Sequence, residues 1–456
     1  MSEQTLRTIG ELLGSIRPAG SFAVRGTAAA GDLAVTVDGV GPLRWPVTPE
    51  QARELRDVAR LARFGQGEHT LLDPNVRNTW EVPRDRITVD EPRWQQTLGP
   101  MLDVVRRDLG LPADCELTAQ RHSLLVYEAG QFFRRHQDSE KADGMIGTLV
   151  VTLPSAFAGG DLVVEHGSER VIGTGSPDDL GFIAFYADCD HEVLPVTDGY
   201  RITLTYNLIA GNRAVPNTDS PDGDVSATLA AHLREHFARP VPVPAWLRNG
   251  GPASKPPAQL VYLLDHQYSQ RGFGWEQLKG ADAARAAALI AAADHAECEA
   301  ALVLAEIQKS YACEYFEDED WMCGRRRRWE LVDGTWTLVG ETWAPIDDEE
   351  EPFEDESDSD SPPKDHPDRL SPDSLDEQWG SNIELTWWID RSGSASPMTA
   401  RVTDDEMCTG TTGADQQPFA VETEGYLGNE GNTVDRWYRR AALVVRPAAQ
   451  GVRDKD

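Results

Sequence analysis

The clearest pattern along the chain is a series of short apolar runs between Ser123 and Ala210, separated at regular intervals by Gly, Asp and Pro. The runs are rich in Val, Ile, Leu, Phe and Tyr: SLLVYEA, IGTLVVTLP, DLVVEH, GFIAFYAD, HEVLPV and YRITLTYNLI. This spacing is typical of an antiparallel sandwich or barrel. A parallel sheet would need helical crossovers, for which the intervals are too short.

Two helical patterns precede these runs. Residues 48–64 begin with Thr48 as a cap and place apolar residues at helical spacing. Residues 94–109 repeat that spacing, with an interruption predicted near Pro100. We therefore expect residues 1–95 to form an α/β support for a strand-rich core over residues 96–212.

The remaining residues, 213–456, show a different pattern of apolar and charged positions. They contain an Ala-rich stretch at 281–308 that predicts a helix, then strand-like runs, and an acidic linker at about 345–378. We expect a separate C-terminal α+β region. Substrate recognition, dimerisation and a degenerate second barrel all stay open as its role.

Composition narrows the class of protein. Hydrophobic residues make up 40% of the 456 residues, enough for a sizeable core. The 76 acidic residues exceed the 43 basic ones and give a formal net charge of −33, which argues against a nucleic-acid partner. No apolar run approaches the length of a membrane span, and six scattered cysteines indicate free thiols in a reducing compartment. We expect a cytoplasmic protein without membrane contact.

Three His-x-Asp/Glu triplets begin at His136, His295 and His366. Only the first lies on a predicted strand, where side chains two positions apart face the same way, so that His136 and Asp138 could hold one ion. The second lies in the Ala-rich helix, where residues two apart diverge by about 200°, and the third in the acidic linker.

Further residues complete the candidate site. His191 begins the strand HEVLPV and would make a face of two histidines and one carboxylate, a set typical of non-haem iron. Arg201 begins the next strand and offers a planar guanidinium suited to a carboxylate, with Thr203 on the same face. Tyr127 lies on the strand that leads into His136.

The segment LLVYEAGQFFRRHQD at 124–138 resembles the Y-x-x-G-x-x-F-x-x-H-x-D motif of iron(II)- and 2-oxoglutarate-dependent dioxygenases related to the prolyl 4-hydroxylase catalytic domain. GGDLVVEH at 159–166 resembles the family's Gly-Gly strand. His191 and Arg201 resemble its distal histidine and its oxoglutarate-anchoring base, for which the family often has lysine. The resemblance covers about residues 97–212.

This resemblance implies an α+β chain with a double-stranded β-helix core, of the jelly-roll or cupin-like kind. It implies Fe(II) held by His136, Asp138 and His191, and 2-oxoglutarate held by Arg201 with help from Tyr127 and Thr203. O2 would be the oxidant and ascorbate a further candidate cofactor. The implied reaction is hydroxylation of a protein side chain, prolyl favoured, with release of succinate and CO2.

Several alternatives remain beside this interpretation. The substrate could be a free amino acid or another small molecule, or the barrel could serve as the scaffold of an interaction protein. Arg134 and Lys141 are candidate substrate-side residues, although a salt bridge and a solvated lysine are the simpler interpretations. The H-x-x-E-H pattern from His232 to His236 is more simply an ordinary helix face than a zinc site. The oligomeric state is open.

Overall fold

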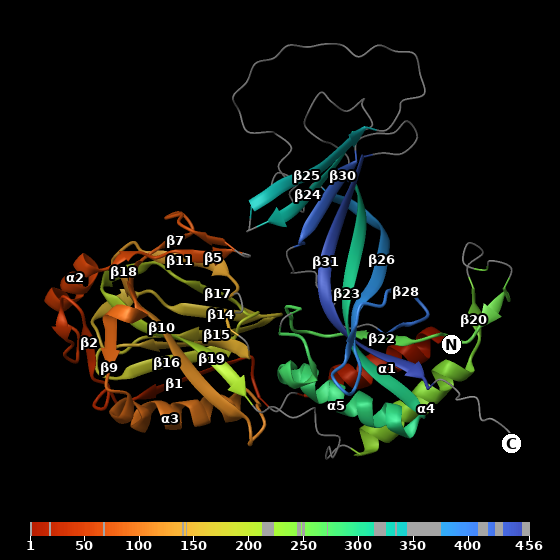
Figure 1. The fold of residues 1–456 in the computed structure, drawn as a ribbon, viewed down its shortest axis with the longest axis horizontal. Coiled ribbons are helices and arrows are strands. Elements are labelled where there is room, and N and C mark those ends of the chain that lie inside the picture. The colour runs from red at the N-terminus through yellow and green to blue at the C-terminus, as the bar shows by residue number, and fades with distance from the viewer. Residues whose placement is uncertain are drawn as a thin grey trace, which may run out of the picture. The chain divides into compact units, whose positions relative to one another are not determined.

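The computed structural model divides the chain into two compact units (Figure 1). The larger unit comprises Arg7–Ala238, Asp265–Ala300 and Pro447–Asp456, and the smaller unit comprises Met1–Leu6, Arg239–Leu264 and Ala301–Arg446. The structure describes residues 2–17, 20–66, 69–138, 141–142, 144–211, 223–243, 248, 251–270, 272–313, 325–332, 335–343, 375–408, 418–424 and 432–448.

The fold is mixed α+β and rich in strands. Its helices are α1 (Ser2–Ser15), α2 (Pro49–Val58), α3 (Glu91–Asp108), α4 (Gly223–Ala238) and α5 (Gly280–His295). Among the described residues, no helix is both long enough and apolar enough to cross a membrane.

Two antiparallel sheets form the centre of the larger unit. The first has seven strands, in the order β1 (Ala23–Ala28), β16 (Leu180–Tyr186), β12 (Met145–Thr152), β19 (Arg201–Gly211), β10 (Glu116–Tyr127), β8 (Trp80–Pro83) and β4 (Arg60–Leu61). The second has five, in the order β15 (Glu169–Gly173), β14 (Leu162–His166), β17 (Asp190–Val193), β11 (Phe132–His136) and β7 (Arg77–Asn78). One apolar cluster draws its buried residues from both sheets.

Short sheets lie beside these two. Their strands are β13 (Phe157–Gly159) with β18 (Val196–Gly199), β2 (Val35–Val37) with β3 (Gly41–Pro42) and β9 (Ile87–Val89), and β5 (Phe64–Gln66) with β6 (His69–Leu71).

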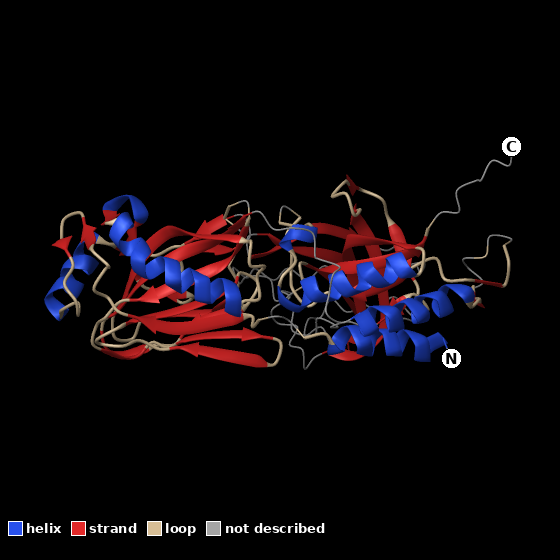
Figure 2. Cartoon of the chain, turned by 90° about the horizontal axis from the view of Figure 1, so that it is seen from below, coloured by secondary structure: helices blue, strands red, loops and turns tan. Residues whose placement is uncertain are grey.

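The central strands are apolar on both faces. In β12 and β16 every residue is buried, because one face meets the interior between the sheets and helices cover the other. Figure 2, seen from below, shows helix α3 in front of strands of the larger unit. Helix α3 turns Trp94, Leu98 and Val105 inward at helical spacing, and the Trp94 indole donates a hydrogen bond to the Tyr206 hydroxyl of β19 at 3.2 Å.

Helix boundaries differ from the sequence expectation in three places. Helix α2 ends at Val58, and α3 continues through Pro100 without the expected interruption, because its buried stripe stays in contact with the sheet. Helix α5 ends at His295, and the remainder of the predicted Ala-rich helix is strand β23 (Cys298–Cys313). There, pairing with β26 (Leu375–Ile389) outweighs the helix propensity of alanine.

The smaller unit contains a ten-stranded sheet. Its other strands are β25 (Thr335–Trp343), β24 (Arg325–Val332), β30 (Ala420–Glu424), β31 (Asn432–Pro447), β27 (Ala395–Ser396), β28 (Ala400–Val402), β22 (Leu260–Leu263) and β29 (Met407–Cys408). A separate pair is β20 (Val241–Pro242) with β21 (Ser254–Lys255). Most of the predicted acidic linker, residues 345–374, lies outside the described residues.

The predicted domain boundaries at 95 and 212 stay predictions. The two compact units divide the chain differently, because residues 223–238 and 265–300, which we expected in the C-terminal region, belong to the larger unit, and residues 2–6 belong to the smaller one. Helix α5 is buried along most of its length and packs against α4, so its apolar sides are covered within that unit.

The buried indole of Trp94 provides a test of this packing. Trp94→Ala should lower the free energy of unfolding by about 3–5 kcal/mol, because it removes a large side chain that has no solvent exposure and leaves a cavity. Urea denaturation followed by circular dichroism measures the change. Gln96→Ala, on the exposed face of the same helix, is the control and should change it by less than about 0.5 kcal/mol. Equal effects of the two variants would contradict the assignment of this face to the core.

Candidate functional site

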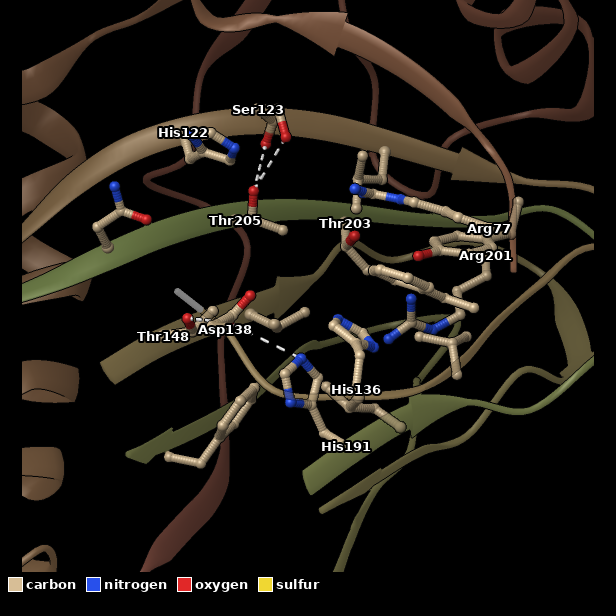
Figure 3. A pocket seen from close by; sticks show the side chains of 18 of the residues that line it. Arg77, His122, Ser123, His136, Asp138, Thr148, His191, Arg201, Thr203 and Thr205 are labelled. Atoms are coloured by element: carbon tan, nitrogen blue, oxygen red, sulfur yellow. Dashed lines mark hydrogen bonds and ion pairs between the residues drawn. The ribbon is translucent and has the colours of Figure 1, made fainter. Parts of the chain in front are cut away.

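A cavity of about 80 Å³ lies between the two sheets of the larger unit (Figure 3). Strands β10, β12 and β19 of the seven-stranded sheet line one side, and β11, β14 and β17 of the five-stranded sheet line the other. Apolar side chains form part of the wall: Leu125, Val150, Leu162, Phe185 and Val193. All the candidate iron and oxoglutarate residues line this cavity: His136, Asp138, His191, Arg201, Tyr127 and Thr203.

The two histidines meet because their strands pair. His136 of β11 lies directly opposite His191 of β17, and their ring centroids are 4.1 Å apart. Asp138 follows β11, with a carboxylate oxygen 3.8 Å from His191 Nε2. The potential ligand atoms of the three side chains all lie within 4.8 Å of one another. The cluster is compact enough to hold one ion.

Backbone carbonyls orient both imidazole rings. His136 Nδ1 lies 2.7 Å from the carbonyl oxygen of Arg134, and His191 Nδ1 lies 3.1 Å from that of Cys189. A carbonyl oxygen only accepts, so each Nδ1 carries the proton and each Nε2 keeps a lone pair for a metal.

Asp138 is held in two further ways. Its carboxylate accepts a short hydrogen bond from the Thr148 hydroxyl, and its amide donates to the carbonyl oxygen of Ala187 at 3.0 Å. A carboxylate fixed by a neighbouring hydroxyl keeps one oxygen aimed at the cluster.

Electrostatics favour the protonation states that bind metal. Burial, together with the neighbouring His191, lowers the pKa of His136 to about 3. Burial alone would raise the pKa of Asp138, but the nearby His191, Lys141 and His136 outweigh it and keep that pKa below its ordinary value. At neutral pH His136 is therefore neutral and Asp138 ionised, the forms in which these side chains act as ligands.

Arg201 lies farther along the same cavity. It faces Tyr127 across the β10–β19 pair, with its guanidinium carbon 5.3 Å from the Tyr127 ring centroid. Its exposed fraction is 3%, and burial lowers its pKa. A Cβ at Gly160, where φ is +67°, would come within 3.0 Å of Arg201 Cδ, so this position of the Gly-Gly segment leaves room for the arginine.

Among the described residues, Arg201 has no ion-pair partner and its neighbour Thr203 has no hydrogen-bond partner for its hydroxyl. Both side chains are buried. Burying a cation without an ion pair and a hydroxyl without a hydrogen bond costs free energy of folding. A ligand that brings a carboxylate to this end of the cavity would satisfy both, so the residues present fit 2-oxoglutarate.

The two candidate substrate-side residues lie in different places relative to the cavity. Lys141 lines the cavity, whereas the Arg134 side chain is exposed and does not. The reason is a register shift in the β11–β17 pair between Phe133 and His136. It turns Phe133 into the cavity, where its ring stacks on His136 at 3.5 Å.

Sequence reasoning missed several residues that line the cavity. Thr148 lies within an apolar run and carries no spacing signal, and Arg77 comes from the short strand β7. The Arg77 guanidinium carbon lies 4.5 Å from the Phe133 ring centroid. His122 is a histidine of the same wall whose pKa is lowered to about 4, first by burial and then by Lys141.

Residues 122–209 match the family model of the 2OG-Fe(II) oxygenase superfamily. The chain is therefore an oxygenase enzyme. Its oxygenase domain belongs to the 2OG-Fe(II) superfamily, which confirms the resemblance found in the sequence.

Solved structures show weak similarity to this chain. A prolyl-4-hydroxylase from Pseudomonas putida is 17% identical, with 45% of this chain and 100% of that chain covered and a TM-score of 0.28. A prolyl hydroxylase from Trichoplax adhaerens, in complex with a peptide fragment of a hypoxia-inducible factor, is 17% identical over 45% and 90%, with a TM-score of 0.27. An oxidoreductase of the 2OG-Fe(II) oxygenase family from Burkholderia pseudomallei is also 17% identical. The match covers 45% of this chain and 90% of that chain, with a TM-score of 0.25. Scores this low carry no argument about the substrate. No curated protein matches the chain.

The Thr148 hydroxyl tests the metal cluster. Thr148→Val should weaken Fe(II) binding by about 10–100-fold, because it removes the hydrogen bond that orients the Asp138 carboxylate. Anaerobic calorimetry on metal-free protein measures the affinity. Thr205→Val is the matched control, since Thr205 lines the same cavity but bonds Ser123 instead of a candidate ligand. If both variants bind like wild type, Thr148 does not orient a ligand.

Proposed function

We propose that the chain is a non-haem Fe(II)- and 2-oxoglutarate-dependent dioxygenase that hydroxylates its substrate and releases succinate and CO2. One observation carries the proposal. The His136–Asp138–His191 cluster and the unpaired Arg201 guanidinium line a single cavity inside the domain that matches the superfamily. The metal cluster would bind one end of 2-oxoglutarate, and the Arg201 guanidinium would bind the distal carboxylate at its other end.

The strand order supports a double-stranded β-helix for the core. Along the chain, β10, β12, β16 and β19 fall in one sheet, and β11, β14, β15 and β17 fall in the other. The sheet orders are β16-β12-β19-β10 and β15-β14-β17-β11. Strands that alternate between two sheets in this way, with one hairpin in the second sheet, wind as a jelly roll.

The chain's own residues have separable tasks in this mechanism. His136 and His191 would hold Fe(II) through Nε2, and Asp138 through a carboxylate oxygen. Arg201 would bind the distal carboxylate of 2-oxoglutarate, with Thr203 donating its free hydroxyl and Tyr127 completing that end. When bound, iron with 2-oxoglutarate and O2 supplies the oxidising power that converts a C–H bond to C–OH.

The apolar wall would exclude water from the reacting atoms. Phe185 packs against His191, with ring centroids 4.6 Å apart, and Val150 lines the cavity beside it. Asp138 would supply a carboxylate ligand to the iron, and by the resemblance to the wider superfamily such a ligand favours hydroxylation over halogenation.

For the substrate, we propose a protein side chain, with prolyl favoured by the resemblance to prolyl 4-hydroxylases. A free amino acid or another small molecule is the second candidate. Two cations beyond Arg201 line the cavity, Arg77 and the exposed Lys141, and they would suit a substrate with its own carboxylate.

An anaerobic titration of metal-free protein with Fe(II) and then 2-oxoglutarate tests the reaction class. We expect a visible charge-transfer band that is lost in His136→Ala. Arg201→Met should need about a hundredfold higher 2-oxoglutarate concentration to give the band, since it leaves the distal carboxylate of 2-oxoglutarate without its buried cationic partner. Arg201→Lys should recover part of the lost affinity for 2-oxoglutarate.

His122→Ala is the matched control for His136→Ala, because His122 lines the cavity without belonging to the cluster. It should keep the band. Folded wild-type protein that gives no band would contradict the proposed function.

The substrate proposals are separated by kinetics with prolyl peptides and with free amino acids. If the substrate is a free acid, Lys141→Met should lower its kcat/KM by at least about tenfold, as expected for the loss of a charge-assisted contact. The KM for 2-oxoglutarate should stay within about twofold, and Lys255→Met, an exposed lysine of the smaller unit, should change neither value. Turnover of peptides alone, unaffected by Lys141→Met, would reject the free-acid alternative.

A further inference from the structure

A buried cluster of charged and polar groups surrounds Asp188, outside the cavity. The Asp188 carboxylate accepts three hydrogen bonds. The donors are His266 Nδ1 at 2.8 Å, the Lys279 ammonium at 2.9 Å and the backbone N–H of Gln267 at 3.1 Å. The side chains of Asp188, His266 and Lys279 are 6%, 5% and 4% exposed. All of these residues belong to the larger unit.

His166, Asp188 and His266 also lie close enough together to suggest a second metal site. The ring geometry argues against one. The rings of His166 and His266 stack with an interplanar angle of 15° and a centroid distance of 4.4 Å, so their lone pairs lie in nearly parallel planes and do not converge. The Lys279 ammonium already neutralises the carboxylate. The cluster is therefore a closed ion-pair network.

The position of Asp188 gives this network its significance. Asp188 is the middle residue of the turn that joins β16 to β17, between Ala187 and Cys189. The Ala187 carbonyl accepts the amide of Asp138 at 3.0 Å, and the Cys189 carbonyl accepts Nδ1 of His191 at 3.1 Å. The two carbonyls that flank Asp188 thus orient two of the three candidate iron ligands.

The residues that hold Asp188 are themselves fixed. The Asp282 carboxylate accepts the amides of Asp265 and His266, each at 2.9 Å, and the Tyr268 hydroxyl at 3.0 Å. The Tyr268 oxygen in turn accepts the Lys279 amide at 2.9 Å. His266 and Lys279 are therefore presented to Asp188 by a pre-organised segment, residues 265–270 and 272–282.

Burying these charges would cost free energy without this complete set of partners. Burial alone would raise the pKa of the Asp188 carboxyl, but His266 and Lys279 outweigh it and keep that pKa well below its ordinary value. The carboxylate is ionised and fully bonded, which makes it a firm anchor for the turn.

We infer that the segment formed by residues 265–270 and 272–282 positions the iron ligands, with His266 and Lys279 clamping Asp188 so that the carbonyls of Ala187 and Cys189 hold Asp138 and His191. This inference rests on the proposed function of the His136–Asp138–His191 cluster. It gives a segment far along the chain a defined task in the oxygenase domain, as a set of positioning residues that do not contact substrate.

The test compares Lys279→Met, Asp188→Asn and the double variant, in the full chain. In metal-free protein, exchange of the Asp138 amide hydrogen should become at least about tenfold faster in each single variant, because its acceptor carbonyl is no longer held. Fe(II) affinity should fall by about 10–100-fold. The double variant should be no worse than the singles, since each single variant already removes the ion pair between Lys279 and Asp188. Lys279→Arg should restore most of the loss seen in Lys279→Met.

Leu98→Ala, in the buried stripe of α3, controls for general destabilisation. It should lower the unfolding midpoint while leaving Asp138 exchange and Fe(II) affinity near wild type. Wild-type exchange of the Asp138 amide in Lys279→Met and Asp188→Asn would overturn the inference. So would two bound metal ions per wild-type chain that fall to one in Asp188→Asn, because Asp188 would then be a ligand. Wild-type protein that binds no Fe(II) would instead refute the proposed function, and the metal-free exchange would still decide the positioning role.

Discussion

The pairing of β11 with β17 is the constraint on which the site depends. It sets His136 opposite His191 and places Asp138 directly after the end of β11. A shift of either strand by one residue would send its histidine to the other face, since strand side chains alternate. β17 also pairs with β14 on its other side, so that a third strand holds the register. The pairing of the strands thus sets the positions of the two histidines, and side-chain packing only adjusts them.

Two of the buried charged positions in the larger unit, Asp188 and Arg201, have opposite character. At Asp188 the carboxylate accepts three hydrogen bonds, and these anchor the turn. At Arg201 and Thr203 the donors are left without a carboxylate among the described residues, and the result is a cavity end that favours an anion. Because burying a charge costs free energy in both places, the same physical rule separates a structural cluster from a ligand-binding one.

Much of this arrangement could be predicted from the sequence, because the informative residues are close together in it. Tyr127 and His136 end two successive strands, and Arg201 and Thr203 lie two apart on one strand, where the period of two places them on one face. The expectation that Asp138 shares the strand of His136 is wrong, because β11 ends at His136 and Asp138 reaches the cavity from just beyond that end. The same rule fails at Arg134, since the irregular pairing between Phe133 and His136 breaks the alternation. Such a bulge leaves no mark in a single sequence.

What the sequence could not reveal are contacts between distant segments. Lys279 reaches Asp188 across 91 residues, and no periodicity links an Ala-rich helical region to a turn in the barrel. Alanine content also predicts helix through residue 308, whereas sheet pairing converts the part beyond Cys298 to strand.

Metal affinity in such a site depends on how little the ligands must rearrange when the ion binds. Here one turn carries the backbone acceptors for Asp138 and His191, so a single loosened anchor would disorder two ligands together. The third, His136, takes its orientation from the carbonyl of Arg134 in its own strand and does not depend on that turn. The candidate centre therefore combines one ligand oriented locally by its strand with two oriented by a turn that residues 265–270 and 272–282 hold. On the inference above, the fold of that distant segment sets the affinity of the proposed iron site.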